Sequence, residues 1–227
     1  MKVSGKTILV TGAGSGMGRE ITLELVRRGA RVIALDIHIE TVVETKNLAG
    51  DLADKIEVFA IDVTDQTAIA ALAETLAFNH TYVDGLINNA GIIQPFVPIK
   101  ELSIEATERV MNVNFYGPLY LIKAFLPEML SRPESHILNV SSMGAYAPVP
   151  GQSVYGSSKA AVKLLTEGLR SELLGTNVGV TVAFPGAVAT NITENSGLEI
   201  PANAAEQSEK FKAMPAPEAA RIMVNAF

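Results

Sequence analysis

The sequence predicts an α/β fold, a doubly wound parallel sheet in a single domain that spans residues 1–227. Two observations support this. Short runs rich in Val, Ile and Leu alternate with longer stretches of helical periodicity. The short runs are almost continuously apolar, which is typical of strands buried on both faces of a parallel sheet. Repeated alternation of this kind indicates a sheet covered by helices on both sides.

Each short apolar run predicts one strand. With 227 residues, of which 48% are hydrophobic, the chain holds enough apolar material for a sizeable core. The predicted strands cover residues 7–11, 31–36, 56–62, 84–89, 136–142 and 178–185.

Amphipathic patterns between these runs predict the helices. Asp65 is the expected N-cap of one of them. Pro118 lies inside the longest pattern, where we expect a break or kink because proline removes a helical hydrogen-bond donor. The predicted helices cover residues 17–29, 40–50, 65–78, 104–130 and 153–175.

The C-terminal part departs from this alternation. Residues 190–214 are polar, small and weakly patterned. A helical pattern then starts at Pro217 and runs to Phe227 without a capping residue. We therefore expect the natural C-terminus to lie beyond Phe227.

Composition excludes several classes of function. The net charge is −6, and no run of Lys or Arg exceeds the pair Arg27–Arg28, which argues against nucleic acid or an anionic membrane as a partner. Without cysteine there is no disulfide or thiolate chemistry, and three scattered histidines predict no metal site. A first strand close to Lys6 leaves no room for a signal peptide, so we expect a cytoplasmic protein.

The turn TGAGSGMG at residues 11–18 predicts a phosphate-binding site. Glycines at positions 12, 14, 16 and 18 let backbone N–H groups approach a pyrophosphate at the positive end of a helix dipole. The turn lies between the first strand and its helix, as dinucleotide binding requires. A tight turn that serves packing alone is the alternative, because Met17 departs from the common G-x-G-x-x-G spacing.

Asp36 predicts which dinucleotide binds. It ends the second predicted strand, 18 residues after Gly18. A carboxylate at this place accepts hydrogen bonds from the adenosine ribose and repels a 2′-phosphate. Ser15 and Ile37 nearby carry no positive charge, so NAD is favoured over NADP. The alternative is that Asp36 caps the following helix.

Seven motifs, in order, resemble the short-chain dehydrogenase/reductase (SDR) family over residues 6–190. A lone Y-x-x-x-K would be weak support, but the ordered set is specific, with Tyr155 13 positions after Ser142 as in the family. The matching segments are TGAGSGMG (11–18), Asp62–Val63, NNAG (88–91), Asn114, Ser142, Tyr155 with Lys159, and PGAVAT (185–190).

The resemblance implies a Rossmann-type fold and a set of cofactor contacts. Asp62 and Val63 would touch the adenine ring, and Thr190 would hold the nicotinamide carboxamide. The expected cofactor-binding residues are Gly12, Ser15, Gly16, Met17, Gly18, Asp36, Asp62, Val63, Asn89, Ala90, Gly91, Tyr155, Lys159, Pro185, Gly186, Val188 and Thr190.

The expected catalytic residues are Asn114, Ser142, Tyr155 and Lys159. Tyrosine has a pKa near 10, but a lysine ammonium one helical turn away and the nicotinamide ring favour the phenolate. Tyr155 would then act as base in oxidation and acid in reduction. Ser142 would hold the substrate oxygen. By resemblance, Lys159 also holds the nicotinamide ribose, and Asn114 a water that links Lys159 to solvent.

We therefore expect hydride transfer between NAD(H) and a small or moderately apolar secondary alcohol or ketone. Hydroxy-ketones, cyclic alcohols, steroid-like molecules and 3-oxoacyl thioesters stay open as substrates. The alternatives are an NADPH-dependent carbonyl reductase of 3-oxoacyl type and a non-catalytic dinucleotide sensor. The resemblance also implies a substrate lid at residues 190–214, and a homodimer or homotetramer formed through the helices at 104–130 and 153–175.

Overall fold

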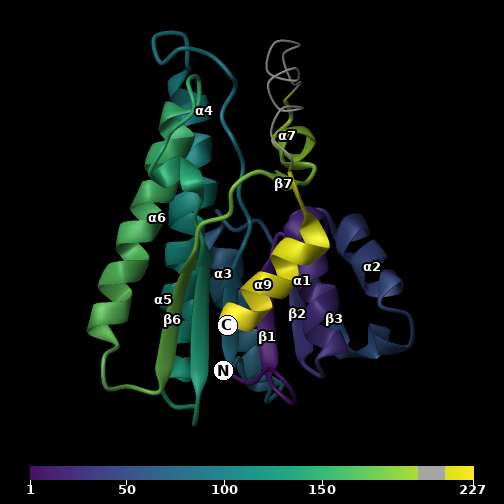
Figure 1. The fold of residues 1–227 in the computed structure, drawn as a ribbon. Helices are drawn as coiled ribbons and strands as arrows, with labels where there is room; N and C mark the ends of the chain where they lie inside the picture. Colours follow the sequence, from purple (N-terminus) through teal and green to yellow (C-terminus); the bar gives the residue numbers. More distant parts are fainter. Residues whose placement is uncertain (199–212) are drawn as a thin grey trace.

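A parallel sheet with the strand order β3-β2-β1-β4-β5-β6 forms the centre of the computed structural model, which describes residues 1–198 and 213–227 (Figure 1). Every strand lies within two residues of its predicted bounds. The predicted doubly wound α/β fold is therefore confirmed. The strands are β1 (Thr7–Thr11), β2 (Arg31–Asp36), β3 (Ile56–Ala60), β4 (Gly85–Asn88), β5 (Ser135–Val140) and β6 (Val178–Ala183).

The strand order changes direction at β1. This strand pairs with β2 on one side and with β4 on the other, so that Val10 lies between Ala34 and Ile87. The connections after β1 and β4 consequently leave the sheet toward opposite faces, and a crevice forms at the carboxyl ends of these two strands. In open α/β sheets this is the place where ligands bind.

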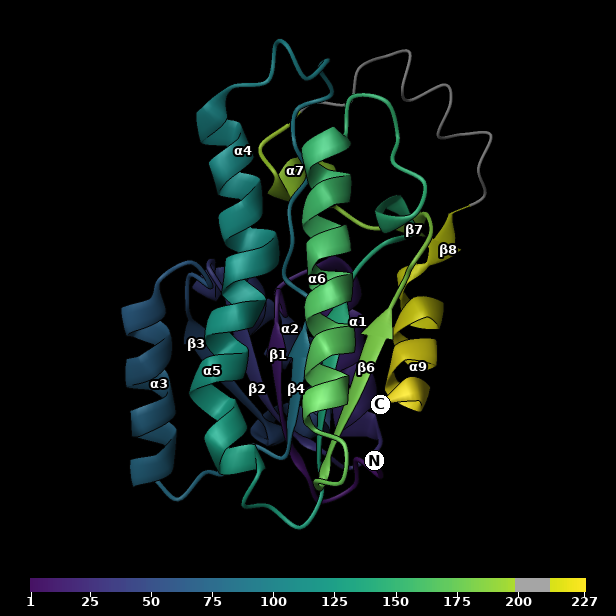
Figure 2. The same cartoon turned by 90° about the vertical axis from the view of Figure 1, so that its left-hand side faces the viewer.

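Helices cover both faces of the sheet (Figures 1 and 2). One face packs against α1 (Gly16–Arg27), α2 (Ile39–Leu48) and α9 (Ala216–Ala226), with Ile21 and Leu25 in its core. The other face packs against α3 (Gln66–Phe78), α5 (Gly117–Met129) and α6 (Ser153–Glu172). Short 3₁₀ segments occupy Gly50–Lys55 and Met143–Ala145.

The predicted helix at 104–130 is interrupted, as expected, but just before Pro118. It consists of α4 (Ile104–Met111), a π-helical segment (Asn112–Tyr116) and α5. Pro118 has no N–H to donate to the carbonyl of Asn114 four residues earlier, and the N–H of Gly117 bonds the Asn112 carbonyl five residues back instead. The widened turn holds the buried side chain of Asn114.

The predicted lid at residues 190–214 is described only at its two ends, because 199–212 lie outside the described residues. Two short strands, β7 (Val188–Ala189) and β8 (Met214–Pro215), pair in parallel and hold these ends together. A single helical turn, α7 (Ile192–Asn195), follows β7. The helical pattern predicted near Pro217 is confirmed as α9.

In the part of the chain that the structure describes, no helix is long and apolar enough to cross a membrane. Nor do three His, Asp or Glu side chains of residues 1–198 and 213–227 come together in a group that could hold a metal ion.

The predicted N-cap of α3 provides a test of the fold. Oδ1 of Asp65 accepts hydrogen bonds from the N–H groups of Thr67 and Ala68, both at 2.9 Å. Asp65→Ala leaves both donors to solvent and should lower the free energy of unfolding by about 1 kcal/mol, measured by urea denaturation. Asp65→Asn retains an acceptor and should lose far less. Equal losses in the two variants would contradict the capping role.

Candidate cofactor and catalytic site

A cleft of about 660 Å³ opens at the carboxyl ends of the central strands. It lies at the reversal of strand order described above. Most of the predicted cofactor residues line it, namely Gly12, Ser15, Gly16, Met17, Asp36, Asp62, Val63, Asn89, Ala90, Gly91 and Thr190.

The glycine turn seats α1 directly on the end of β1. Gly12 has a φ of +65°, which side-chain-bearing residues rarely adopt. A Cβ on Gly18 would overlap the carbonyl oxygen of Gly12, so only glycine permits this approach. The N-terminus of α1 thus lies at the cleft, where its partial positive charge favours an anion. Gly18 itself does not line the cleft, and its role is packing.

Asp36 fastens the end of β2 to the glycine turn. Its Oδ2 accepts a hydrogen bond from the N–H of Gly14 at 3.0 Å, and its Oδ1 accepts one from the N–H of His38 at 3.3 Å. The residue that precedes α2 is His38, so Asp36 is not the N-cap of that helix. The carboxylate lines the cleft instead.

The NNAG segment joins the ends of three neighbouring strands. Oγ1 of Thr11 accepts hydrogen bonds from the N–H groups of Asn89 and Ala90, each at 3.0 Å. The side chain of Asn89 donates back to the Thr11 carbonyl at 3.0 Å. Asn88 donates to Asn139 on β5 at 2.7 Å. Sequence reasoning missed Thr11, which fixes the loop that lines the cleft.

Asn114 is buried, and its carboxamide is fully engaged. Its Oδ1 accepts from the N–H of Ile92, while its Nδ2 donates to the Ile92 carbonyl and to Ser158 Oγ, all at 2.9 Å. Pro118 leaves the backbone carbonyl of Asn114 without its usual helical donor.

Tyr155 and Lys159 lie one turn apart on α6, as predicted. Burial raises the pKa of Tyr155 above 10.0, and a hydrogen bond with Ser142 acts in the opposite direction. Burial also lowers the pKa of Lys159 to about 8. Nζ of Lys159 donates to the Val140 carbonyl at 3.0 Å and lies 6.0 Å from the centre of the Tyr155 ring. The expected lowering of the phenol pKa by this ammonium is thus not met in this structure, because burial dominates.

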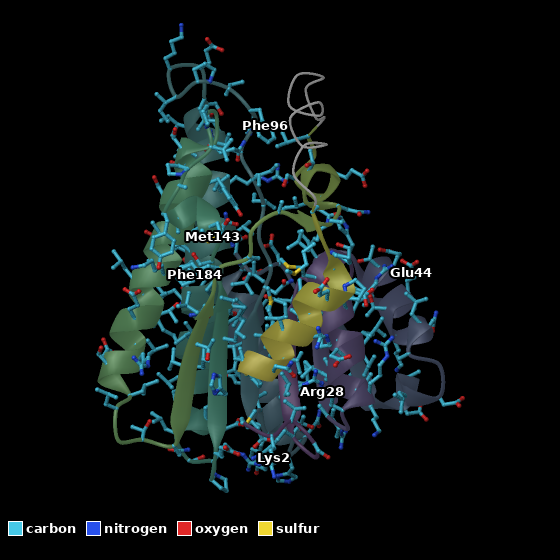
Figure 3. All side chains as sticks on the ribbon, in the orientation of Figure 1. Lys2, Arg28, Glu44, Phe96, Met143 and Phe184 are labelled. Atoms are coloured by element: carbon cyan, nitrogen blue, oxygen red, sulfur yellow. The ribbon has the colours of Figure 1, made fainter. Side chains whose placement is uncertain are left out.

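Ser142 begins the short 3₁₀ segment after β5. Its Oγ accepts a hydrogen bond from the N–H of Gly144 at 3.0 Å, which leaves its own hydrogen free to be donated. The Met143 N–H bonds the carbonyl of Pro185 at 3.0 Å, which joins the chain at Met143 to the chain that follows Phe184; both of these residues are labelled in Figure 3. Pro185 therefore supports the Ser142 turn. Of the predicted cofactor residues, Pro185, Gly186 and Val188 do not line the cleft, and neither do Tyr155 and Lys159.

The cleft residues that were not predicted include two groups from distant segments. Glu105, Glu108, Arg109 and Asn112 form one face of α4 and its continuation. Their i, i+3, i+4, i+7 spacing could have indicated this. The other group comes from α7, where Asn195 donates to Ser15 Oγ at 2.7 Å. These two residues are 180 positions apart, and no sequence signal joins them.

The residues present fit a dinucleotide. Residues that follow β1, β2 and β4 all line the cleft, so it extends across the ends of three strands. The glycine turn offers backbone N–H donors to a diphosphate. Asp36 lies where a ribose hydroxyl group would find an acceptor.

Comparisons with known proteins agree with this geometry. A model of the short chain dehydrogenase family matches residues 6–200. EphD of Mycobacterium tuberculosis is 38% identical over 198 residues, which are 86% of this chain but 33% of EphD, so the chain spans about a third of that relative. The 3-oxoacyl-[acyl-carrier-protein] reductase FabG of Thermotoga maritima is 34% identical over 194 residues, 86% of this chain and 78% of FabG.

A solved structure is similar over nearly the whole chain. The closed form of serine dehydrogenase complexed with NADP+ superposes with a TM-score of 0.88 at 31% identity, covering 96% of this chain and 87% of that one. The match to the family model and these relatives show that the chain belongs to the short-chain dehydrogenase family.

Proposed function

We propose that the protein is an NAD(H)-dependent oxidoreductase that interconverts a secondary alcohol and a ketone, with Tyr155 as acid and base. The observation that carries this proposal is that Ser142 and Tyr155 lie together near the buried amine of Lys159. A Cβ on Gly144 would lie 3.4 Å from both Ser142 Oγ and the Tyr155 ring, and Lys159 Nζ lies 6.0 Å from the centre of that ring. These groups follow β5 and begin α6, next to the loop that lines the cleft.

The choice of NAD rests on charge. The solved serine dehydrogenase is complexed with NADP+, so relatives of this fold bind the phosphorylated cofactor too. Here the cleft is lined by the carboxylates of Asp36, Asp62, Glu105 and Glu108. Like charges placed together cost several kcal/mol, so a 2′-phosphate is disfavoured beside Asp36.

Two arginines near the cleft, among the residues that the structure describes, have hydrogen-bond partners within the protein. Arg109 lines the cleft and donates to the Ser196 carbonyl at 3.3 Å. Arg19 next to the glycine turn bonds the Gly14 carbonyl at 2.6 Å and forms an ion pair with Glu44 at 2.5 Å. The charge of Arg19 is thus balanced by Glu44, which supports NAD.

The dinucleotide, when bound, supplies or accepts the hydride. The protein handles the proton and the substrate oxygen. Ser142 donates its hydroxyl hydrogen to that oxygen and holds it against Tyr155, while one of its two lone pairs accepts the bond from the Gly144 N–H. Tyr155 Oη removes the alcohol proton in oxidation and returns it in reduction.

Lys159 has room to serve the cofactor. A Cβ on Gly91 would lie 3.0 Å from Lys159 Nζ, so the glycine of NNAG keeps space open beside the amine. We propose that the ammonium turns from the Val140 carbonyl to the nicotinamide ribose when the dinucleotide binds. The charge would then stabilise the phenolate of Tyr155.

The segments next to the catalytic residues support an uncharged substrate. Residues 91–99 and 141–152 contain no Asp, Glu, Lys or Arg. A small or moderately apolar alcohol or ketone suits such a lining. The similarity to FabG supports the alternative, an NADPH-dependent reductase of 3-oxoacyl type. A non-catalytic dinucleotide sensor is less well supported, because it would not need the four catalytic side chains.

We also propose assembly into a homodimer or homotetramer through α5 and α6. The two helices lie side by side on the outer face in Figure 2. Leu164 on α6 is 65% exposed, and Tyr116 beside α5 is 40% exposed. Apolar side chains of this size on neighbouring helices suit a protein interface.

Loss of the Tyr155 hydroxyl tests the catalytic assignment. Tyr155→Phe should lower kcat by about 10²- to 10⁴-fold, because it removes the general acid and base. The probes are cyclohexanol and acetoin with NAD+, and acetoacetyl-coenzyme A with NADH. NADH affinity, measured by fluorescence, should stay within about twofold, since the diphosphate and ribose contacts remain. Tyr82→Phe at the opposite end of the sheet is the matched control. Near wild-type turnover in Tyr155→Phe would refute the role.

Fluorescence titration tests the cofactor assignment. The wild-type protein should bind NADH tighter than NADPH by about tenfold or more, because Asp36 repels the 2′-phosphate. Asp36→Ser should reduce the difference between the NADH and NADPH dissociation constants. Asp51→Ser removes the same charge from an exposed position and should leave this difference unchanged. Tighter binding of NADPH by the wild type would overturn the choice of NAD.

The ionisation of Tyr155 should depend on the cofactor. Because burial disfavours the phenolate, the free protein should show a Tyr155 pKa above 10.0. Saturating NAD+ should lower this pKa, since the positive ring and the relocated ammonium favour the phenolate. ¹³C NMR of ring-labelled tyrosine measures both values, and Tyr155→Phe identifies the resonance. An unchanged pKa would contradict the proposed movement of Lys159.

A further inference from the structure

The helix that carries Tyr155 begins only two residues before it. Ser153 is the first residue of α6, and Gln152 precedes it without forming a side-chain cap. The first N–H groups of any helix lack partners within the helix. Unless something else accepts their hydrogen bonds, the first turn frays, and here that turn holds the proposed acid and base.

A side chain from another loop supplies the missing acceptor. Oε1 of Gln94 accepts hydrogen bonds from the N–H groups of Val154 at 2.7 Å and Tyr155 at 3.0 Å. These are the donors that an N-cap Ser or Asp usually satisfies. Gln94 is fully buried and lies 60 positions upstream of Val154.

The contact is reciprocal. Nε2 of Gln152 donates to the backbone carbonyl of Gln94 at 2.7 Å. The same loop bonds Asn114 through both backbone groups of Ile92. One short segment after β4 thus holds the backbone of Tyr155 and the side chain of Asn114 in a fixed relation.

Burial of the Gln94 carboxamide costs free energy, which its hydrogen bonds have to offset. Among the described residues, Nε2 of Gln94 has no hydrogen-bond partner. An unpartnered buried N–H is unfavourable, and an apolar side chain of similar size would avoid it. Two bonds made by Oε1 to the catalytic helix offset this cost.

We propose that Gln94 is a positioning residue for the reaction. Its carboxamide oxygen caps α6, holds the backbone of Tyr155 and thereby sets the phenol against Ser142. The inference rests on the proposed function, because it assigns Gln94 a part in that chemistry. Displacement of a reacting group by about 1 Å can lower a rate by about a hundredfold.

Two substitutions separate the cap from mere packing. Gln94→Met keeps the length of the side chain but removes the acceptor. Gln94→Glu keeps the acceptor, and a carboxylate is favoured at a helix N-terminus. Asp65→Ala is the matched control, because it removes a cap with two bonds from α3, which carries none of the four catalytic residues.

Three measurements are made on each full-length variant. Amide hydrogen exchange reports on Val154 and Tyr155, and ¹³C NMR of labelled tyrosine reports on the surroundings of the Tyr155 ring. Steady-state kinetics on the ketone or alcohol probes named above are compared with the NADH dissociation constant.

In Gln94→Met, we expect the two amides to exchange about tenfold faster or more and the Tyr155 resonance to move. Its kcat should fall by roughly ten- to a hundredfold while NADH affinity stays within about twofold. Gln94→Glu should restore the protection and most of kcat. Asp65→Ala should change only stability.

Unchanged amide exchange in Gln94→Met would show that the cap is not formed. Faster exchange with an unmoved Tyr155 resonance and unaltered kcat would confine Gln94 to a structural role and overturn the proposal. A parallel loss of kcat and NADH affinity that Gln94→Glu does not rescue would do the same. If the wild type turns over no probe, the proposed function fails, and amide exchange with the Tyr155 resonance still decides whether Gln94 positions this residue.

Discussion

The site depends on one steric constraint, the direct contact between the N-terminus of α1 and the carboxyl end of β1. A helix dipole acts on a diphosphate only when no side chain separates them. Gly18 meets this constraint against the Gly12 carbonyl, and Asp36 then fixes the turn through the Gly14 N–H. Thr11, at the end of β1, fixes the loop after β4 by accepting hydrogen bonds from two of its N–H groups. The cleft is therefore a consequence of how closely one helix and one strand meet.

Burial governs the ionisation of Tyr155 and Lys159, which lie outside the lining of the cleft. Burial raises the pKa of Tyr155 and lowers the pKa of Lys159, and each change favours the uncharged form of the side chain. The fold alone thus holds a phenol that resists ionisation beside an amine that gives up its proton more easily. A charged cofactor that enters this region changes the balance for both groups at once. Both groups are therefore uncharged more readily in the free protein, and their protonation states can change when a charged cofactor binds.

The sequence was sufficient for the doubly wound fold, the positions of the six central strands and most of the predicted cofactor residues in the cleft, because continuous apolar runs and glycine spacing are local signals. It also located the helix interruption near Pro118, although the π-helical segment at 112–116 depends on how Asn114 is packed. The cap supplied by Gln94 and the hydrogen bond between Asn195 and Ser15 join segments that are distant in the sequence. Local sequence periodicity therefore cannot predict them. The raised pKa of Tyr155 follows from burial, which residue spacing does not measure.

The small pairing of β7 with β8 has a consequence for how this scaffold can change over time. Since Val188 and Met214 are held side by side, the chain between them begins and ends at one fixed place. The entropy of closing a loop grows only slowly with its length, by about 0.6 kcal/mol for each doubling. Insertions or deletions between Asn195 and Met214 would therefore leave Thr190 and the cleft in register. The length of the chain can change there during evolution without moving the pairing of β7 with β8.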